Sequence, residues 1–588
     1  MRRMTSALVR PAVFSPIVAA LVATIAALVS LDMIGMRWEV PLVYSGDAIA
    51  AAAHFKTVMD TGWYEHQPAL GAPYGQVYFD YPTADNLHFV VAFLLGLIWP
   101  DWGVVMNVHF LLGFGLAAAA AAWFLGRIGL RWPLVIALSV TFAIAPYHFT
   151  RGEGHLFLSW YWVVPLGLAL VLDILGGRDL WGARVGARRG LGHLTGRSGR
   201  TVGILALVAS ASAYYAIFTL LLGGVAALAA VLVARNGRRA LGAIAAAAVT
   251  IGVMLANMAP DILYRLAQGV NPGALQRTPV ESEIYGLKLS QLLLPAPYHR
   301  FGPFRELRRL YDAHYPLPSE YPALGLLAAL GLVILVGAGL YAVAVAARGV
   351  AMPTLVVSLA PLAFLAIVAF LFSTVGGLST LVSFATASIR GWNRISIVIA
   401  ALALAGLGLV LQTAVERVTR SRRLLPAVGT AVAAAVVLGI GAWDQLPPDD
   451  SASRAAVVAS YDSDADFGQR LETELGPGAL VFELPYIAFP ESPPSGDALD
   501  SDQLRLFLHS DLHVSGGGIR GREDIDSLGA IAALPTDEFI TEAEALGFSG
   551  VVIDTFAEEG IAPLDAMRAA IDGGEITSLD GRFFFFRF

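Results

Sequence analysis

The sequence predicts a polytopic α-helical membrane protein that ends in a soluble α/β domain. Of its 588 residues, 56% are hydrophobic and only 14% are charged, whereas ordinary soluble domains have about 25% charged residues. Apolar runs long enough to cross a bilayer as helices recur along positions 1–443. The remaining segment, 444–588, carries 28 Asp and Glu but only 8 Arg. The two parts are therefore suited to different environments.

Arginine-rich segments between the apolar runs predict the orientation in the membrane. They lie at 2–3, 127–131, 178–200, 235–239, 348 and 417–423, and the positive-inside rule assigns them to the cytoplasm. The first apolar run has no small-residue cleavage signature, so we expect a retained helix and not a signal peptide. The N-terminus is then cytoplasmic, and the C-terminal domain lies outside the cytoplasmic membrane.

This orientation gives about eleven crossings. They are expected at 14–35, 103–126, 132–148, 156–176, 201–212, 213–234, 240–258, 322–346, 353–373, 395–416 and 424–443. The segment 201–234 is long for one crossing and short for two, so two broken or tilted helices that meet near Ser212 would fit. A further apolar segment, 88–99, reads as an interfacial helix. Four outer loops remain, at 37–86, 148–155, 260–321 and 376–394.

The segment 444–588 alternates helical and strand patterns. Helices are expected at 465–474, 536–546 and 563–571, and strands at 479–484, 550–554 and 582–588. This alternation predicts a small α/β sandwich. The domain is strongly acidic, which excludes nucleic-acid binding as a function. The chain has no cysteine, so a disulfide, a thiolate metal site and a cysteine nucleophile are excluded as well.

The first outer loop combines a carboxylate with aromatic side chains. Asp47 stands just beyond the first membrane helix, and Trp63, Tyr64, Tyr74 and Tyr78 follow. Sugar rings pack on aromatic faces, and a carboxylate can take a proton from an attacking hydroxyl group. The alternatives are an aromatic belt at the membrane interface and, for Asp47, a helix N-cap. A base and a cap are compatible roles.

The second outer loop concentrates ionisable residues in one short turn between two crossings. His148, Arg151, Glu153 and His155 lie there, and such residues at membrane depth are functional candidates. Glu153 and His155 are separated by one glycine, so both could face one phosphate or one divalent cation. Carboxylate with imidazole suits Zn, Mn or Mg. The alternative is simple hydration of the loop.

The last two outer loops add further candidates. Arg390 and Arg394 precede the tenth crossing on the outer side, against the positive-inside trend. They could clamp a phosphate, or they could reach lipid headgroups. Glu283 and His299 lie in an amphipathic stretch of the long loop, where substrate contact competes with an interfacial helix.

Taken together, these residues resemble the GT-C superfamily of membrane glycosyltransferases. Such enzymes have an acidic residue at the start of the first outer loop, here Asp47. They often have an acidic pair in the next outer turn, here Glu153-Gly-His155 with His in place of the second acid. Several have an outer Arg near the donor phosphate, which Arg390 or Arg394 would supply. No WWDYG-type acceptor motif is present, which disfavours peptide N-glycosylation.

The resemblance implies transfer of a sugar, hexosyl or pentosyl, from a polyprenyl-phosphate donor to a bacterial cell-envelope glycan or glycolipid acceptor. Asp47 would be the general base of an inverting reaction, and Arg390 or Arg394 would stabilise the leaving phosphate. Glu153 and His155 would hold a divalent cation or orient the donor. Two alternatives are a flippase or transporter for a lipid-linked sugar, and a non-catalytic envelope-assembly protein. A flippase needs a polar path through the bundle, whereas the polar residues here lie in the outer loops.

Overall fold

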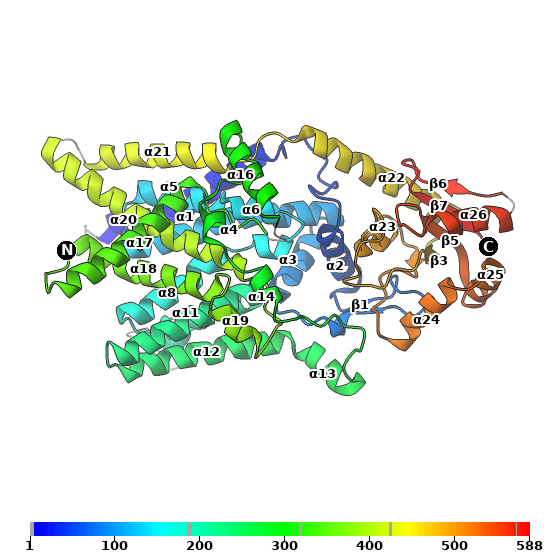
Figure 1. Ribbon diagram of the computed structural model, residues 1–588, viewed down its shortest axis with the longest axis horizontal. Helices are drawn as coiled ribbons and strands as arrows, with labels where there is room; N and C mark the ends of the chain where they lie inside the picture. The colour runs from blue at the N-terminus through cyan, green and yellow to red at the C-terminus, as the bar shows by residue number, and fades with distance from the viewer. Residues whose placement is uncertain (1–4, 185–190, 317–319, 423–425, 572) are drawn as a thin grey trace.

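A computed structural model describes residues 5–184, 191–316, 320–422, 426–571 and 573–588. The molecule is elongated, with long helices filling one part and the strands gathered at the C-terminal end (Figure 1). Arg2, Arg3, Arg188, Arg189 and Arg423, which belong to the basic segments that predicted the orientation, lie outside the described residues.

The larger part of the chain, the membrane module, is helical. Eight of its described segments are long and apolar enough to cross a membrane, so the protein is a multi-pass membrane protein. The helices of the module are α1 (Thr5–Ser30), α4 (Trp102–Ile128), α5 (Trp132–Ala143), α6 (Pro146–Arg151), α7 (Leu156–Ser159), α8 (Val163–Gly176), α9 (Leu191–Leu194), α10 (Arg197–Ala211), α11 (Ala213–Leu232), α12 (Gly237–Asn257), α17 (Leu326–Ala347), α18 (Thr354–Ser373), α20 (Ser396–Arg422) and α21 (Pro426–Gln445).

The expected number of eleven crossings is not confirmed, because several expected crossings are interrupted. The expected 156–176 crossing stops after α7 and starts again at Val163. A continuous helix would bury Pro165 in its interior, where proline breaks the hydrogen-bond ladder. The expected 132–148 crossing corresponds to one of the eight apolar segments, Trp132–Arg151, in which α5 and α6 meet near Pro146. The break expected near Ser212 is confirmed, since Ser212 is extended and separates α10 from α11.

Small residues let the membrane helices approach closely. Ala19, Ala23 and Ala27 of α1 recur every four residues and are fully buried, on the face that packs against α4 and α5. A Cβ atom added at Gly331 of α17 would lie only 2.2 Å from the carbonyl oxygen of Ala403 in α20. Such contacts are typical of helix packing in lipid, where dispersion forces and not water exclusion hold helices together.

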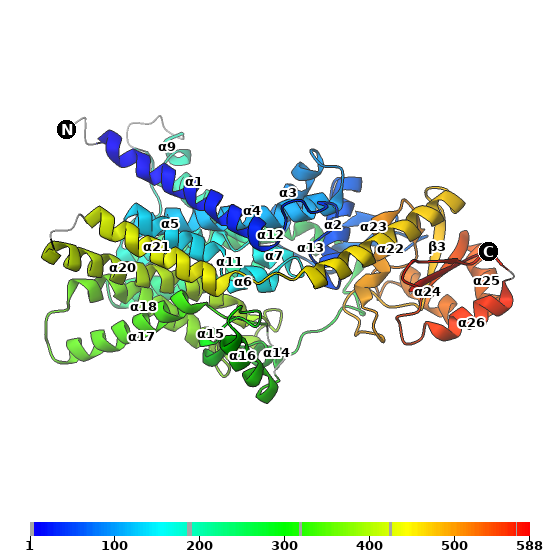
Figure 2. The same cartoon turned by 90° about the horizontal axis from the view of Figure 1, so that it is seen from above.

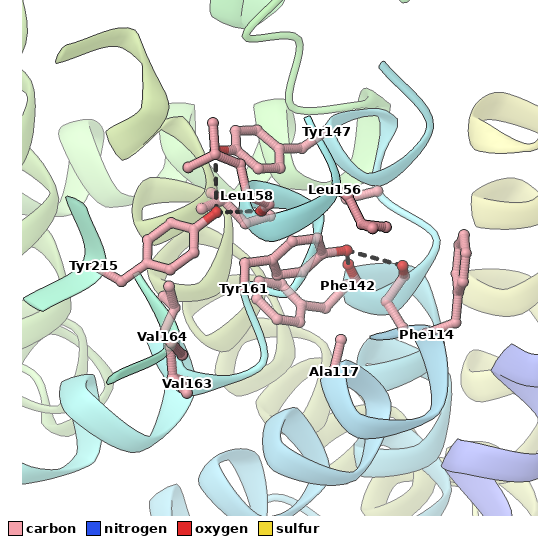
Figure 3. Packing of buried hydrophobic residues seen from close by; sticks show 14 of the residues in the cluster. Phe114, Ala117, Phe142, Tyr147, Leu156, Leu158, Tyr161, Val163, Val164 and Tyr215 are labelled. Atoms are coloured by element: carbon pink, nitrogen blue, oxygen red, sulfur yellow. Dashed lines mark hydrogen bonds between the residues drawn. The ribbon is translucent and has the colours of Figure 1, made fainter. Parts of the chain in front are cut away.

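Inside the module, the hydroxyl groups of Tyr147, Tyr161 and Tyr215 form hydrogen bonds (Figure 3). The Tyr161 hydroxyl donates to the carbonyls of Phe142 and Ala143, at 2.9 and 2.8 Å. Tyr215 donates to the carbonyl of Leu158 at 2.5 Å and lies 3.1 Å from the Tyr147 hydroxyl. These bonds cross the breaks between α5, α7 and α11 and compensate for backbone groups that the breaks release.

Short elements connect the membrane helices on the side of the C-terminal domain. They are α2 (Asp47–Thr61), β1 (His66–Gln67), β2 (Gln76–Val77), η1 (Tyr78–Asp80), α3 (Asn86–Gly96), α13 (Ala259–Gln268), α14 (Glu281–Ile284), α15 (Leu289–Leu293), α16 (Gly302–His314), α19 (Leu378–Ser383) and η2 (Trp392–Ile395). Figure 1 shows α2 and β1 between the helical module and the C-terminal sheet, and Figure 2 shows the same place for α2.

The C-terminal segment forms an α/β fold around a five-stranded sheet, as the sequence predicts. The strand order is β4-β3-β5-β7-β6, with β3 parallel to β4 and β5, and with β7 antiparallel to β5 and β6. The elements are α22 (Ser451–Leu475), β3 (Leu480–Leu484), η3 (Asp500–Leu504), α23 (Arg505–His509), β4 (His513–Val514), α24 (Glu523–Ala532), α25 (Thr536–Ala545), β5 (Phe548–Asp554), α26 (Ile561–Ala570), β6 (Ile576–Thr577) and β7 (Phe583–Arg587).

The first outer loop continues the C-terminal sheet beyond its β4 edge. Leu70 forms a parallel bridge with Val514, whose backbone N–H donates to Ala69 and whose carbonyl accepts from Ala72. The loop therefore covers an edge that would otherwise present unpaired backbone groups. It also fixes the loop that contains Asp47 to the C-terminal domain.

A buried polar network joins the same two parts beside α2. The Tyr44 hydroxyl donates to Asp464 and lies 2.8 Å from His509 Nε2. Arg505 pairs with Asp464 and Asp502 at 2.8 Å and donates to the carbonyl of Tyr44. Because these groups are almost wholly buried and mutually paired, the network holds the C-terminal domain in one orientation on the membrane module.

Candidate functional site

Several of the predicted functional residues meet where α2, the α6–α7 turn and the start of α20 come together. His155 Nε2 lies 4.0 Å from Asp47 Oδ2 and 3.8 Å from Glu320 Oε1. Glu320 in turn pairs with Arg151 and Arg394. Residues from four separate parts of the sequence thus form one cluster, which we call the Asp47 site.

Asp47 is the first residue of α2 and not its N-cap. The cap position is Gly46, whose φ of 54° and ψ of −135° suit glycine and few other residues. A carboxylate in the first turn of a helix is stabilised by the helix dipole. The Asp47 side chain is 77% exposed, so its carboxylate is accessible to a substrate.

The surroundings of Asp47 make its carboxyl a better proton acceptor than an ordinary aspartate. Although its side chain is open to solvent, the protein atoms around Asp47 displace part of the surrounding water and raise its pKa; the carboxylates of Asp500 and Glu491 in the C-terminal domain raise it further, whereas Arg394 and Arg390 oppose the shift. The C-terminal domain therefore approaches this site directly. Gly46 is also close to the C-terminal domain, because an added Cβ atom there would lie 3.6 Å from the Leu499 side chain.

The turn between α6 and α7 brings Arg151 and His155 to the site. Gly152 has a φ of 51°, which side-chain-bearing residues rarely adopt, and the backbone N–H of His155 donates to the carbonyl of Arg151. Burial lowers the pKa of His155 to about 4, with Arg151 adding to the shift and Glu320 opposing it. His155 is therefore neutral near pH 7, and one of its ring nitrogens can accept a hydrogen bond.

Glu320 organises the arginines of the site. Its carboxylate lies 2.6 Å from Arg151 Nη2 and 2.7 Å from Arg394 Nη2, and it also accepts from Arg394 Nε. Burial alone would raise the pKa of Glu320, but the two guanidinium groups lower it to about 2. Glu320 is thus ionised at every physiological pH and holds both arginines in place.

Arg390 and Arg394 lie directly before the apolar helix α20. Arg394 is in the short 3-10 helix η2, and Arg390 precedes that helix. Arg394 stacks on Tyr214, with its guanidinium carbon 4.3 Å from the ring centroid. Arg390 pairs with Glu281 at 3.1 Å. Arg390 precedes the apolar segment Trp392–Thr419, and Arg394 lies in its first turn.

The site can hold an anion beside a proton acceptor. The guanidinium groups of Arg151, Arg390 and Arg394 face the carboxylates of Glu281 and Glu320, and the ionised carboxylate of Asp47, which lies 4.0 Å from His155, balances the third positive charge. Asp47 lies next to these guanidinium groups on the side of the C-terminal domain. Such an arrangement could bind a phosphate group and accept a proton from a neighbouring hydroxyl group.

A divalent cation does not fit the site as it stands. The predicted ligands Glu153 and His155 make separate contacts, because Glu153 accepts from the backbone N–H groups of Leu42 and Val43 at 2.6 and 3.0 Å. Across the described residues, no three His, Asp or Glu side chains form a group that could hold a metal ion. His155 lies near two carboxylates, but Arg151 and Arg394 already neutralise one of them.

Glu153 instead stabilises the start of the first outer loop. Its side chain is fully buried, and burial raises its pKa to about 7, with the two backbone N–H groups opposing the shift. By accepting from residues 42 and 43, it holds the chain that leads to Asp47. Glu153 therefore positions the start of the first outer loop, which differs from the cation ligation that was predicted for it.

Other predicted substrate-binding residues lie away from the Asp47 site. His148 is buried in the membrane module, stacked on Phe114 with ring centroids 3.5 Å apart. Glu283 binds the backbone N–H of Gly376 and the hydroxyl of Thr380. His299 is buried and pairs with Asp444 at 3.2 Å. Each of these side chains joins elements of the fold.

The predicted aromatic platform is divided between core and surface. Tyr64 is fully buried and stacks on Phe89, and Trp63 packs beside it. Tyr74 is exposed. Tyr78 lies near the site, since Asp47 and Asp500 contribute to raising the pKa of its hydroxyl, after the larger effect of burial. Of the four rings, Tyr78 is the one whose surroundings include Asp47.

Comparisons with known proteins return solved structures and no sequence relative. No family model and no curated protein matches the chain. The apo oligosaccharyltransferase of Archaeoglobus fulgidus is similar with a TM-score of 0.44 and 12% identity, over 98% of this chain and 74% of that one. The complex of that enzyme, AglB, with an inhibitory peptide and a dolichol-phosphate gives 0.43 and 13%, over 97% and 74%. The arabinofuranosyltransferase AftD from Mycobacteria gives 0.45 and 17%, over 96% of this chain and 38% of that chain.

Proposed function

We propose that the protein is a membrane glycosyltransferase of the GT-C type. It moves a sugar from a polyprenyl-phosphate donor to a hydroxyl group of a cell-envelope glycan or glycolipid outside the cytoplasmic membrane. The observation that carries the proposal is the cluster of Asp47, His155 and Arg394, which are far apart in the sequence and which bring a carboxylate, an imidazole and a guanidinium group to one place. The resemblance of the outer loops to the GT-C superfamily supports the same reaction.

In this reaction Asp47 is the general base. Its carboxylate takes the proton of the acceptor hydroxyl as the oxygen attacks the anomeric carbon of the donor sugar. The raised pKa of Asp47 improves this proton transfer. The bond between the anomeric carbon and the phosphate oxygen breaks on the opposite face, so the configuration inverts, and polyprenyl phosphate leaves with the bonding electrons.

Arg394 and Arg390 bind the phosphate in the ground state and stabilise the charge that grows on it as it leaves. They lie immediately before the apolar helix α20, at the depth where the phosphate of a membrane-anchored lipid is held. Glu320 keeps Arg394 oriented before the donor arrives, so little reorganisation is needed during the reaction. His155, neutral near pH 7, orients a hydroxyl group beside Asp47.

The test is a transfer assay with the full-length protein in nanodiscs. The donors are a panel of polyprenyl-phosphate sugars, the acceptors are envelope glycans, and the anomeric configuration of the product is read by NMR. We expect an inverted product from the wild type and none from Asp47→Asn. The matched control is Asp60→Asn, which changes an exposed carboxylate of the same helix, paired with Lys56. Full activity of Asp47→Asn would refute the role of Asp47 as base.

Two additional arms separate the remaining possibilities. Parallel reactions with EDTA, and with Mg, Mn or Zn restored, decide whether transfer needs a divalent cation. If no donor gives product although the protein is folded and monodisperse, movement of a fluorescent lipid-linked sugar across the bilayer of proteoliposomes tests the flippase alternative. Absence of both activities would favour an envelope-assembly protein.

A further inference from the structure

The membrane module has a second arginine cluster at the end opposite the C-terminal domain. Helix α4 begins at Trp102, whose indole N–H donates to the carbonyl of Leu508 in that domain. The helix has 27 residues, and a helix of that length extends about 40 Å. Its last turn, which holds Arg127, is therefore remote from the Asp47 site. Helices α8 and α18 lie together at this end (Figure 1).

One buried carboxylate faces three guanidinium groups in this cluster. Asp173 of α8 accepts from Arg127 Nη2 with both oxygens, at 2.8 and 2.7 Å. Arg178 and Arg200 lie 3.4 and 3.9 Å from the same carboxylate. Their side chains are 66% and 38% exposed, whereas that of Asp173 is 4% exposed. Two positive charges are thus in excess, and they belong to the accessible arginines.

A cavity of about 220 Å³ adjoins the cluster between α4, α8 and α18. Arg127, Asp173 and Arg178 line its charged end, and Phe124, Leu172 and Leu362 line its apolar walls. Arg200 does not line the cavity but lies 3.9 Å from the Asp173 carboxylate at that end. A free anion would use the charged end only. The apolar walls instead suit a hydrocarbon chain attached to the anion, and the surrounding bilayer supplies such molecules.

We propose that this cavity binds an anionic phospholipid. The phosphate lies on Arg178 and Arg200, and the first part of one acyl chain lies between Phe124, Leu172 and Leu362. Basic pockets between membrane helices bind acidic headgroups in this way, because the low dielectric of the membrane strengthens the attraction. Asp173 pairs with Arg127 in the wall of the cavity, so the more exposed Arg178 and Arg200 are the arginines that bind the lipid phosphate.

The test is native mass spectrometry of the full-length protein after exchange into equal amounts of phosphatidylglycerol and phosphatidylcholine with identical acyl chains. We expect the wild type to retain phosphatidylglycerol in preference to phosphatidylcholine. Each arginine near an acidic headgroup changes affinity about fivefold. The double variant Arg178→Gln with Arg200→Gln should therefore lose about 25-fold, while Arg127 continues to neutralise Asp173.

A second variant tests the cavity without changing charge. Gly176 lines the cavity, and an added Cβ atom would meet no atom within 4 Å, so Gly176→Phe can place its ring in the space proposed for the acyl chain. The matched control is Gly203→Phe, at an exposed position of α10 that is equally open. Loss of phosphatidylglycerol from Gly176→Phe but not from Gly203→Phe supports the proposal. Equal retention of the two lipids by the wild type, or unchanged retention in Gly176→Phe, would overturn it.

Discussion

Replacing Glu320 with glutamine removes the one carboxylate shared by two nearly buried guanidinium groups. Arg151 is 3% exposed, and Glu320 is 14% exposed. Loss of one partner of such a pair leaves uncompensated charge in a poorly solvated place, which costs about 3–5 kcal/mol. The amide introduced by the substitution could accept from one arginine, but its NH₂ group would then face the other. We therefore expect Glu320→Gln to be clearly less stable than the wild type.

The assay is thermal unfolding of the detergent-solubilised protein, followed by intrinsic fluorescence. The chain has 11 Trp and no Cys, so tryptophan emission reports unfolding and thiol-reactive dyes do not. For a large chain each kcal/mol moves the unfolding temperature by about 2 °C. The expected decrease for Glu320→Gln is therefore on the order of 10 °C or less, but well above the resolution of the method.

The matched control is Glu306→Gln in α16. Glu306 also pairs with an arginine, Arg309, at 2.7 Å, but both side chains are more than half exposed. Water and salt screen that pair, so its loss should leave the unfolding temperature unchanged. If Glu320→Gln unfolds at the same temperature as Glu306→Gln, then Glu320 does not neutralise the two arginines, and the charge balance of the Asp47 site is wrong.

Three further predictions concern the same site and the domain above it. Asp500→Asn should move the acidic limb of the pH–activity profile to lower pH. The Asp500 carboxylate raises the pKa of Asp47, and only the ionised form of Asp47 is an active base. An acidic limb at unchanged pH would contradict this prediction. Tyr44→Phe should cost about 1–3 kcal/mol of stability, because the buried Asp464 carboxylate loses the Tyr44 hydroxyl as a donor and keeps Arg505; the loss is measured as faster limited proteolysis near 446–450, whereas Tyr74→Phe, at an exposed position, should show none. Arg394→Lys should lower kcat/KM with the lipid-linked donor about tenfold or more, because lysine lacks the planar, multiple-donor group; equal kcat/KM would refute phosphate binding there.

The sequence predicted the membrane helices and the strands of the C-terminal domain well, because both depend on local patterns. Apolar length predicts a span, and alternating β-branched runs predict strands such as 479–484, observed at Leu480–Leu484. The pairing of residues 69–72 with the β4 edge could not be predicted. The loop there shows no strand pattern, and its partner, Val514, lies more than 400 residues away.

The site was predicted in part. Asp47 was predicted from the carboxylate and aromatic residues of the first outer loop, Arg394 from its position against the positive-inside trend, and His155 because ionisable groups at membrane depth are functional candidates. The structure brings these three near one another. Glu320 satisfies the same criterion, since it stands shortly before the apolar helix at 326–347. Glu320 was not predicted, because the loop that contains it is long and because its two arginine partners are distant in the sequence.

Adjacency in the sequence misled the prediction at 153–155. Glu153 and His155 were paired because one glycine, Gly154, separates them, but the two side chains contact different partners. Glu153 reaches back to residues 42 and 43, while His155 reaches toward Asp47. A short spacing limits the distance between two Cα atoms, but backbone geometry decides whether the side chains meet.

The two ends of the membrane module use the same electrostatic arrangement. At one end Glu320 holds Arg151 and Arg394, and at the other Asp173 holds Arg127 with further arginines around it. In each case a single acidic group fixes an arginine that would otherwise be costly to bury. Around Asp173 the arginines outnumber the acid, and this excess argues for a phosphate-bearing membrane lipid as the ligand. At the Asp47 site the three arginines are balanced by Glu281, Glu320 and Asp47, and we propose that Arg390 and Arg394 bind the phosphate of the donor there.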